Sequence, residues 1–387
     1  MSKNITVLFI THYSNMYGAN LSLCRLMIEL RVKNNVQPIV LLSHRGEICE
    51  CLDQNGIKYF ISHFYWWVNA DKGIFQILLN YRKQIRNKLR ITKLVNLINS
   101  EKIDLVYSNS VTINLGVFMS RKLNCPHIWQ IRETLQAYNF KYSIFEFQVK
   151  KLFKKGADRY IVISDFLLNN FKNFLPIKRT VRIYNGISQN IENKKIVNIS
   201  NVLNIALVGI ICDQKNQLDA LKALTILKTK GIDKVNLHFI GGAKSEYLNM
   251  INDYVENNSL QDMVTFHGHV SNVNEILNDM NLGLVCARDE AFGRVTIEYL
   301  LHGMPVIASN SGANEELVQD KQNGFIYELK NAEELAERIE YFIKNPLKLE
   351  TMGIFAKEYA ARNFSSEKNT AAIYAVIEEL VNSRSEE

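Results

Sequence analysis

The sequence predicts an α/β protein made of two doubly wound domains, each a parallel sheet covered by helices on both faces. Three observations support this fold class. Apolar runs of strand length alternate with segments of helical spacing, and this scheme occurs twice along the chain. The 387 residues, 47% of them hydrophobic, also exceed what one ordinary core holds. Ligands of such sheets bind at the carboxyl ends of the strands.

The first domain is expected over residues 1–190. Its first strand is followed by a polar loop and by LSLCRLMIELRVKN, which has helical spacing. The predicted strands are ITVLFIT (5–11), PIVLLS (38–43), DLVYSNS (104–110), HIWQIRE (127–133) and RYIVIS (159–164).

The second domain is expected over residues 200–365, after a polar, Asn-rich linker at 187–201. A C-terminal amphipathic helix, at about 366–387, is expected to pack back on the first domain. The predicted strands are NIALVGI (204–210), NLHFIGG (236–242), VTFHGHV (264–270), LGLVCA (282–287), PVIAS (305–309) and GFIYE (324–328).

Composition excludes several classes of protein. No run approaches eighteen apolar residues, and the apolar run after Lys3 is too short for a signal peptide, so it is interpreted as a buried strand. The six cysteines are scattered, and the pair Cys49 and Cys51 lacks a second pair or nearby histidines, which argues against a zinc site. Free thiols in a reducing cytoplasm are therefore expected.

Charge is divided unevenly along the chain. Residues 1–200 carry 29 Lys and Arg against 12 Asp and Glu, a net +17, whereas the remainder carries 17 against 27, a net −10. The split supports two domains with different partners. The basic half favours anionic partners such as a membrane surface, a phosphorylated acceptor or nucleic acid.

The stretch DEAFGRVTIEYLLHGMPVIASNSGANEELV (289–318) places two glutamates around the start of a helix. A buried strand and a turn precede it, Arg294–Leu301 has helix character, and Gly303 is expected to end the helix. Glu290 then lies at the carboxyl end of the strand, and Glu298 lies in the helix.

This arrangement suits a nucleotide sugar. Free N–H groups at a helix start attract anions, and Gly293 lets the backbone approach a ligand closely, so a diphosphate fits there. Glu290 accepts hydroxyl hydrogens from a sugar ring, and Glu298 accepts those of a ribose diol. Spacing alone favours an alternative, in which Glu290 caps the helix and Glu298 is a surface residue.

The same stretch resembles the E-x7-E segment of the family 4 retaining glycosyltransferases. Their GT-B fold consists of two Rossmann-like domains that face each other across a cleft. Tyr299 and Ala313 depart mildly from the family pattern. The positions that match it, in order, are Glu290, Phe292, Gly293, Glu298, Gly303, Pro305, Val306, Gly312 and Glu316.

The resemblance covers nearly the whole chain and implies a site. YGANLSLCRLMIEL resembles the first glycine-rich loop, CPHIWQIRE the strand before a catalytic loop, VGIICDQKNQLDALKA the phosphate-binding loop, and VTFHGHV the wall of the nucleobase. The implied catalytic residues are Glu290, Lys215 and Arg132. The implied donor-binding residues are Gly18, Gly209, Lys215, Gly242, His267, Gly268, Val270, Glu290, Ala291, Phe292, Gly293, Arg294, Val295 and Glu298.

Two departures affect the implied chemistry. The family usually has Arg after the glycine matched by Gly209, whereas this chain has Ile210. Lys215 remains, and Arg288 and Arg294 are candidates to compensate. Many members have His where this chain has Arg132 followed by Glu133.

The mechanism implied by the resemblance is transfer with retention of anomeric configuration. Charge that builds on the leaving diphosphate is stabilised by Lys215 and by N–H groups around Gly293, through a transition state like an oxocarbenium ion. The chain contains no D-x-D sequence, so we expect no metal and no cofactor. Glu290 orienting the sugar and a covalent intermediate both stay open.

Aromatic and basic residues are interleaved in two segments, HFYWWVNADKGIFQILLNYRKQIRNKLRITKLVNLI (63–98) and FEFQVKKLFKK (145–155). Interfacial helices carry such faces, and many of the resembling enzymes use lipid-linked acceptors, so an anionic membrane surface is an expected partner. The alternative is a solvated helix with an ordinary packed face. His12 lies either toward the cleft or, more commonly for such histidines, in the core or a loop. No nucleic-acid motif accompanies the charge.

The sequence therefore favours a cytoplasmic transferase, peripheral on the inner face of the membrane, that extends a cell-surface polysaccharide or glycolipid with a sugar from a nucleotide-sugar donor. Its acceptor is a saccharide, in our expectation lipid-linked. A nucleotide-sugar epimerase of similar fold and a non-catalytic nucleotide-sugar-binding module are the alternatives. The base, the sugar and the acceptor are not specified by the sequence.

Overall fold

A computed structural model describes residues 4–69, 74–98, 100–135, 140–188 and 202–384. The chain divides into two compact units. Unit 1 comprises Met1–Gly186 and Ser366–Glu387, and unit 2 comprises Ile187–Ser365. The sequence predicted the boundary between the two domains at residues 190–200. Residues 189–201, which form most of the expected linker, lie outside the described residues.

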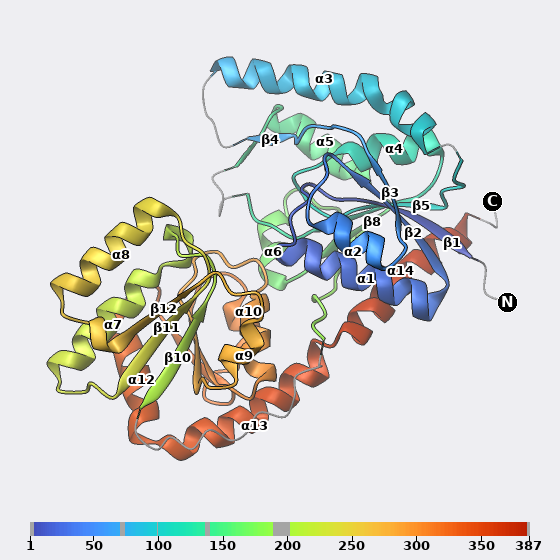
Figure 1. The fold of residues 1–387 in the computed structure, drawn as a ribbon. Coiled ribbons are helices and arrows are strands. Elements are labelled where there is room, and N and C mark those ends of the chain that lie inside the picture. Colours follow the sequence, from blue (N-terminus) through green and yellow to red (C-terminus); the bar gives the residue numbers. More distant parts are fainter. Residues whose placement is uncertain (1–3, 70–73, 99, 136–139, 189–201, 385–387) are drawn as a thin grey trace. The chain divides into compact units, whose positions relative to one another are not determined.

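Unit 1 is built on a seven-stranded sheet in the order β3-β2-β1-β5-β6-β8-β9, in which every pairing is parallel (Figure 1). A separate antiparallel pair joins β4 and β7. The strands are β1 (Ile5–Ile10), β2 (Val36–Leu42), β3 (Lys58–Ile61), β4 (Val68–Asn69), β5 (Leu105–Ser108), β6 (His127–Ile131), β7 (Lys141–Tyr142), β8 (Arg159–Val162) and β9 (Thr180–Arg182).

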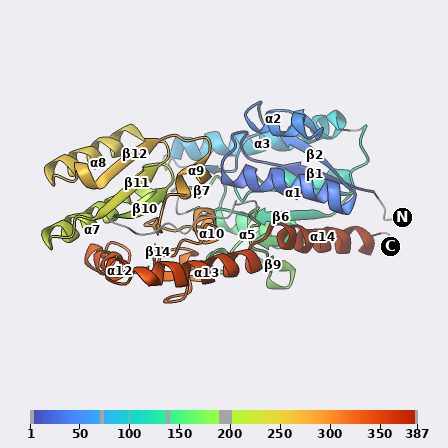
Figure 2. The ribbon, with the colours of Figure 1, turned by 60° about the horizontal axis from the view of Figure 1, so that its bottom comes forward.

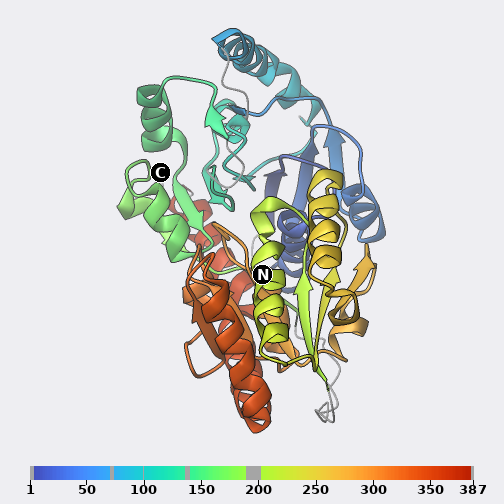
Figure 3. The same ribbon diagram turned by 90° about the vertical axis from the view of Figure 1, so that its left-hand side faces the viewer.

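Helices cover both faces of this sheet because its strands are apolar on both sides. One buried cluster joins the sheet to α1, α2 and α14, and another joins it to α3 and α4. Figures 1 and 2 both show α14 beside α1, and Figures 1 and 3 show α3 as an outer element of unit 1. The helices are α1 (Gly18–Asn34), α2 (Ile48–Gln54), α3 (Ile74–Leu97), α4 (Leu115–Leu123), α5 (Glu146–Gly156), α6 (Asp165–Phe171) and α14 (Ser366–Ser383).

Unit 2 has a six-stranded parallel sheet in the order β12-β11-β10-β13-β14-β15. In each sheet the chain adds strands first on one side of its first strand and then on the other, so the order reverses beside β1 in unit 1 and beside β10 in unit 2. Doubly wound folds bind ligands at such a switch point. The strands are β10 (Leu203–Val208), β11 (Val235–Ile240), β12 (Val264–Gly268), β13 (Leu282–Val285), β14 (Val306–Ser309) and β15 (Gly324–Tyr327).

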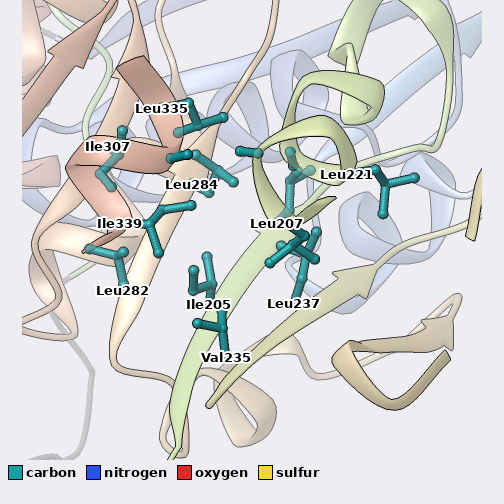
Figure 4. Packing of buried hydrophobic residues seen from close by; sticks show 14 of the residues in the cluster. Ile205, Leu207, Leu221, Val235, Leu237, Leu282, Leu284, Ile307, Leu335 and Ile339 are labelled. Carbon is teal, nitrogen blue, oxygen red and sulfur yellow. The ribbon is translucent and has the colours of Figure 1, made fainter. Parts of the chain in front are cut away.

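The core of unit 2 lies between this sheet and the helices α7, α8 and α12. In Figure 4, Leu237 and Ile205 from the strands lie near Leu221 of α7 and Ile339 of α12. Truncation of one such leucine to alanine typically costs about 2–5 kcal/mol. The helices are α7 (Gln217–Thr229), α8 (Ser245–Asn257), α9 (Val273–Leu277), α10 (Arg294–Leu301), α11 (Asn314–Leu317), α12 (Ala332–Lys344) and α13 (Pro346–Asn363).

Local sequence signals set several helix boundaries. The expected helix Arg294–Leu301 is confirmed as α10; the left-handed glycine Gly293 (φ 87°) precedes it, and Gly303 (φ 66°) follows it. Asn331 caps α12 by accepting a hydrogen bond from the Glu334 N–H at 3.0 Å. Among the described residues, no helix combines the length and the apolar character needed to cross a bilayer.

Candidate functional site

The loops that follow β10, β11 and β12 in unit 2 are held together through glycines. Gly209 has φ 143° and Gly241 has φ 147°, a region that L side chains rarely adopt. A Cβ at Gly241 would lie 2.3 Å from the Gly209 carbonyl oxygen, and the Gly241 N–H donates to the Gly268 carbonyl at 2.8 Å. A Cβ at Gly242 or Gly268 would meet no atom within 4 Å, so both face open space.

Glu290 follows β13 and is fixed by the neighbouring loop after β14. A Cβ at Gly312, whose φ is 72°, would lie 2.3 Å from both the nitrogen and the carbonyl oxygen of Glu290. The Ala313 N–H donates to the Glu290 carbonyl at 2.8 Å. The glycine expected from the family pattern therefore lets two loops pack on each other and holds the backbone of Glu290 in place.

Lys215 and Glu290 form an ion pair at the carboxyl edge of this sheet, although 75 residues separate them. Lys215 Nζ donates to Glu290 Oε2 at 2.6 Å, and the side chains are 31% and 21% exposed. Burial by itself raises the pKa of Glu290, but the charge of Lys215 and hydrogen bonds from Lys215 and the Gly293 N–H together lower it below its ordinary value. The site thus presents an ammonium and an ionised carboxylate, both partly open to solvent.

The start of α10 carries a second ion pair. Arg294 Nε donates to Glu298 Oε1 at 2.8 Å across one helical turn, and both side chains are 24% exposed. Ala291 and Val295 are half-buried. Phe292 is only 3% exposed, and its ring packs on Phe364 at 6.1 Å, so a ligand can meet its backbone but not its ring.

Ile210 is 47% exposed where the family pattern has an arginine. Of the two arginines expected to compensate, Arg294 contacts Glu298, whereas Arg288 lies against the loop that carries Lys215. The Arg288 N–H donates to the Gln214 carbonyl at 2.9 Å, and its guanidinium contacts the carbonyl and the carboxylate of Asp213. Arg288 therefore lies against the loop that was expected to bind phosphate.

His267 lies at the end of β12 and pairs with a histidine that the sequence did not indicate. Its Nε2 is 3.0 Å from Nδ1 of His238, and the rings stack at 5.2 Å. Burial and the charge of His267 lower the pKa of His238 to about 4, so His238 is neutral near pH 7. Val270, two residues after Gly268, is half-buried at the same end of the strand.

In unit 1, Arg132 lies at the carboxyl end of β6 and is only 6% exposed. Its Nε donates to Asn109 Oδ1 at 2.6 Å, and its Nη1 donates to Asn185 Oδ1 at 2.7 Å. Gly18 is the first residue of α1 in the same unit. The two asparagines were not expected, because neither lies in a stretch whose spacing marks a site.

Glu133, next to Arg132, forms a buried pair with His12, which follows β1. Glu133 Oε1 is 3.6 Å from His12 Nε2, and Glu133 Oε2 accepts hydrogen bonds from the Ser110 hydroxyl at 3.1 Å and the Val111 N–H at 3.2 Å. Burial raises the pKa of Glu133 to about 7, while burial and Arg132 lower the pKa of His12 to about 3. His12 is thus a buried residue at the switch point of the sheet.

Trp66 and Trp67 belong to the 63–98 segment that was expected to contact a membrane, but neither is fully exposed. Trp67 is fully buried, and its Nε1 donates to the Val111 carbonyl at 2.6 Å. Trp66 is half-buried, and its Nε1 donates to the His12 carbonyl at 2.7 Å. The tryptophan part of the membrane prediction is therefore wrong: local spacing does not distinguish aromatic residues that pack inward from those that face solvent.

Helix α3 does present a mixed apolar and basic surface. Tyr81, Ile85 and Leu89 are 47%, 43% and 77% exposed and lie one turn apart. They are interleaved with the α3 basic set, which is Arg82, Lys83, Arg86, Lys88, Arg90 and Lys93. Part of this set is engaged: Arg90 donates to the His63 carbonyl at 3.0 Å, and Lys88 lies over the Phe118 ring.

Two protein-family models match the chain. Residues 43–190 match the model described as Glycosyltransferase Family 4, and residues 189–359 match the model described as Glycosyl transferases group 1. An uncharacterised glycosyltransferase of Methanocaldococcus jannaschii is 28% identical over 91% of this chain and 94% of its own length. The Escherichia coli O-antigen biosynthesis glycosyltransferase WclY is 25% identical over 64% of this chain and 72% of its own.

Solved structures share the fold at lower identity. The crystal structure of Anabaena HepE in complex with UDP has a TM-score of 0.79 and 20% identity, over 97% of this chain and all of that one. A complex of the same Anabaena protein with UDP-glucose has a TM-score of 0.76.

Proposed function

The chain belongs to the family 4 glycosyltransferases and has the GT-B fold, and from this premise we propose that it transfers a sugar from a nucleotide-sugar donor to a saccharide acceptor in the synthesis of a cell-surface polysaccharide or glycolipid. The observation that carries the proposal is the contact between Lys215 and Glu290, at 2.6 Å, at the carboxyl edge of the sheet in unit 2. The curated E. coli relative named above acts in O-antigen biosynthesis, which supports a polysaccharide product.

In the proposed reaction, the bond between the anomeric carbon and the diphosphate breaks, and charge builds on the leaving oxygen. We expect Lys215 and the N–H groups at the start of α10 to stabilise this charge, since preorganised donors lower such a barrier. Glu290, ionised and held by Gly312 and Ala313, accepts hydrogen bonds from sugar hydroxyls and stabilises positive charge on the ring. Transfer proceeds with retention and without a metal ion.

A uridine nucleotide is the first donor to test. Solved structures of the Anabaena protein hold UDP and UDP-glucose, and that protein shares the fold of this chain. Glu298 is proposed to hold the ribose diol, because it lies on α10 about one turn after the proposed diphosphate site. When the donor binds, the Glu298 carboxylate would give up its ion pair with Arg294 and accept hydrogen bonds from the diol instead.

The acceptor is proposed to be bound by unit 1 and to be lipid-linked, with the protein peripheral on an anionic membrane. Support comes from the exposed residues Tyr81, Ile85 and Leu89 and from the α3 basic set. An anionic surface attracts each nearby basic residue by about 1 kcal/mol.

The test is turnover of a panel of UDP-, GDP-, ADP- and dTDP-sugars, followed by ranking of the four nucleoside diphosphates by thermal shift. A transferase slowly hydrolyses its donor and releases the nucleoside diphosphate. An epimerase would change the sugar before release, and a binding module would bind without turnover, so either result would replace the proposal.

A further inference from the structure

Unit 1 contains an apolar pocket of about 360 Å³ between β7, α5 and α6. Its walls include four aromatic rings and two aliphatic side chains, from Phe140, Tyr142, Ile144, Val149, Phe171 and Phe174. A pocket of this size and composition lies in the range that small-molecule ligands occupy.

The wall of the pocket is preformed. Strand β7 is paired with β4, and the Tyr142 ring packs on Trp67 at 4.6 Å. Phe174 packs on Phe153 at 6.0 Å, and Phe153 stacks on Trp129 at 4.9 Å. Because these rings form a buried cluster behind the pocket, its shape does not depend on the arrival of a ligand.

The surface around the pocket is suited to a lipid. Phe145 and Phe147, at the start of α5, are 70% and 68% exposed and stack on each other at 6.0 Å. Lys141 and Glu146 both line the pocket, and the exposed Lys150 on the next turn of α5 pairs with Glu146 at 2.7 Å, which leaves Lys141 to meet a lipid phosphate. Exposed aromatic rings beside cations match a membrane interface and complement a lipid phosphate.

Two residues of the pocket wall connect it with the carboxyl edge of the unit 1 sheet. Leu135, which also lines it, follows Glu133 by two residues. The Phe140 ring packs on Trp66 at 6.0 Å, and Trp66 donates its hydrogen bond to His12. The wall of the pocket is therefore linked to the edge where Arg132 and Glu133 lie, which favours a substrate over a bulk membrane lipid.

From these contacts we infer that the pocket binds the hydrocarbon chain of the acceptor, and that the acceptor's phosphate lies at the mouth beside Lys141. The inference rests on the function proposed above and adds the place where the lipid part of the substrate is held. Phe145 and Phe147 are then the residues that enter the bilayer from which the chain is drawn.

The experiment uses the full chain and a series of prenyl and n-alkyl monophosphates of increasing length, with inorganic phosphate as the chain-free probe. Trp66, Trp67 and Trp129 are the only tryptophans of the sequence, and all lie in or beside the cluster behind the pocket, so their fluorescence reports binding. Affinity is expected to rise about fourfold per added methylene and to reach a plateau when the pocket is full.

Two variants at one position test the assignment. Ile144→Asp is expected to weaken farnesyl phosphate binding at least tenfold, and Ile144→Phe, which stays apolar, is expected to move the plateau to a shorter chain. Phe145→Ser is the matched control, since its side chain lies outside the lining: it should bind farnesyl phosphate within twofold of the wild type but sediment less with phosphatidylglycerol vesicles.

Binding that does not depend on chain length, or a plateau that Ile144→Phe leaves in place, overturns the inference. Displacement of bound farnesyl phosphate by phosphatidylglycerol vesicles also overturns it, because the occupant is then a membrane lipid. UDP binding is measured on the same samples. If the wild type binds UDP but none of the lipid phosphates, only the assignment of the pocket is contradicted. If the wild type neither binds nor turns over any nucleotide sugar, the proposed function is contradicted.

Discussion

Replacement of Glu133 by glutamine removes a buried carboxyl whose pKa is raised by burial from 4.5 to about 7. The folded protein keeps this proton at pH values where the unfolded chain has released it. The stabilisation is therefore complete below about pH 4.5 and is lost as pH rises through 7. A rise of this size in the pKa of Glu133 corresponds to a change of about 3 kcal/mol in the free energy of unfolding.

The groups that face Glu133 are His12 and Arg132. His12 acts in the opposite direction, because its pKa is lowered to about 3 and it costs stability as pH falls below 6.5. Both residues are kept in the Glu133→Gln variant, so their effects largely cancel in the difference between variant and wild type.

The measurement is urea unfolding at pH 5 and pH 8, followed by tryptophan fluorescence, which reports unit 1 because Trp66, Trp67 and Trp129 all lie there. The unfolding free energy of the wild type minus that of Glu133→Gln should fall by about 2–3 kcal/mol between the two pH values. Glu146→Gln, at an exposed position, is the control. A difference that stays constant with pH would refute the buried-carboxyl argument.

Three further outcomes are expected. Lys215→Ala should weaken nucleoside diphosphate binding about 10- to 100-fold by calorimetry, since a charge-assisted contact is worth about 1.5–3 kcal/mol; unchanged affinity would assign the phosphates to Arg288. Gly312→Val should destabilise unit 2 by at least about 2 kcal/mol in calorimetric unfolding, with Gly242→Ala near neutral, because only the first Cβ meets backbone. Replacement of the α3 basic set by glutamine should reduce sedimentation with anionic vesicles at low salt, and retained binding would move the contact to α5.

Much of the fold was predictable because parallel strands buried on both faces leave clear apolar runs. Both α/β sheets and the helix α10 are confirmed at or near the expected residues. The short strands β3 and β9 were not expected, since KYFI and TVR lack the length that marks a buried run. The burial of Trp67 was not predictable from a segment that mixes aromatic and basic residues.

The residues of the candidate site could be predicted only where they belong to a recognisable sequence motif. The resemblance of the segments around Glu290 and Lys215 to the family pattern was enough to name both residues, and the structure places them in contact. The pair of His12 and Glu133 spans 121 positions and has no spacing signature, so only the sheet topology brings it together.

Tyr299 departs from the family pattern, and the sequence alone does not indicate which residues make room for its ring. A Cβ at Gly283 would lie 2.3 Å from the Tyr299 ring, so the glycine in β13 makes room for it. The Tyr299 hydroxyl in turn accepts a hydrogen bond from the Val208 N–H at 2.7 Å, one residue before Gly209. The larger side chain thus supports the start of the loop that leads from β10 to Lys215.

The most direct test of the central claim is steady-state turnover of Glu290→Gln with the donor selected from the nucleotide-sugar panel, beside the dissociation constant of the nucleoside diphosphate. The account predicts that kcat falls by at least about 100-fold while nucleoside diphosphate affinity is not weakened, because Glu290 acts on the sugar and Lys215 keeps its charge. Wild-type turnover in this variant would contradict the claim that Glu290 and Lys215 form the site of sugar transfer.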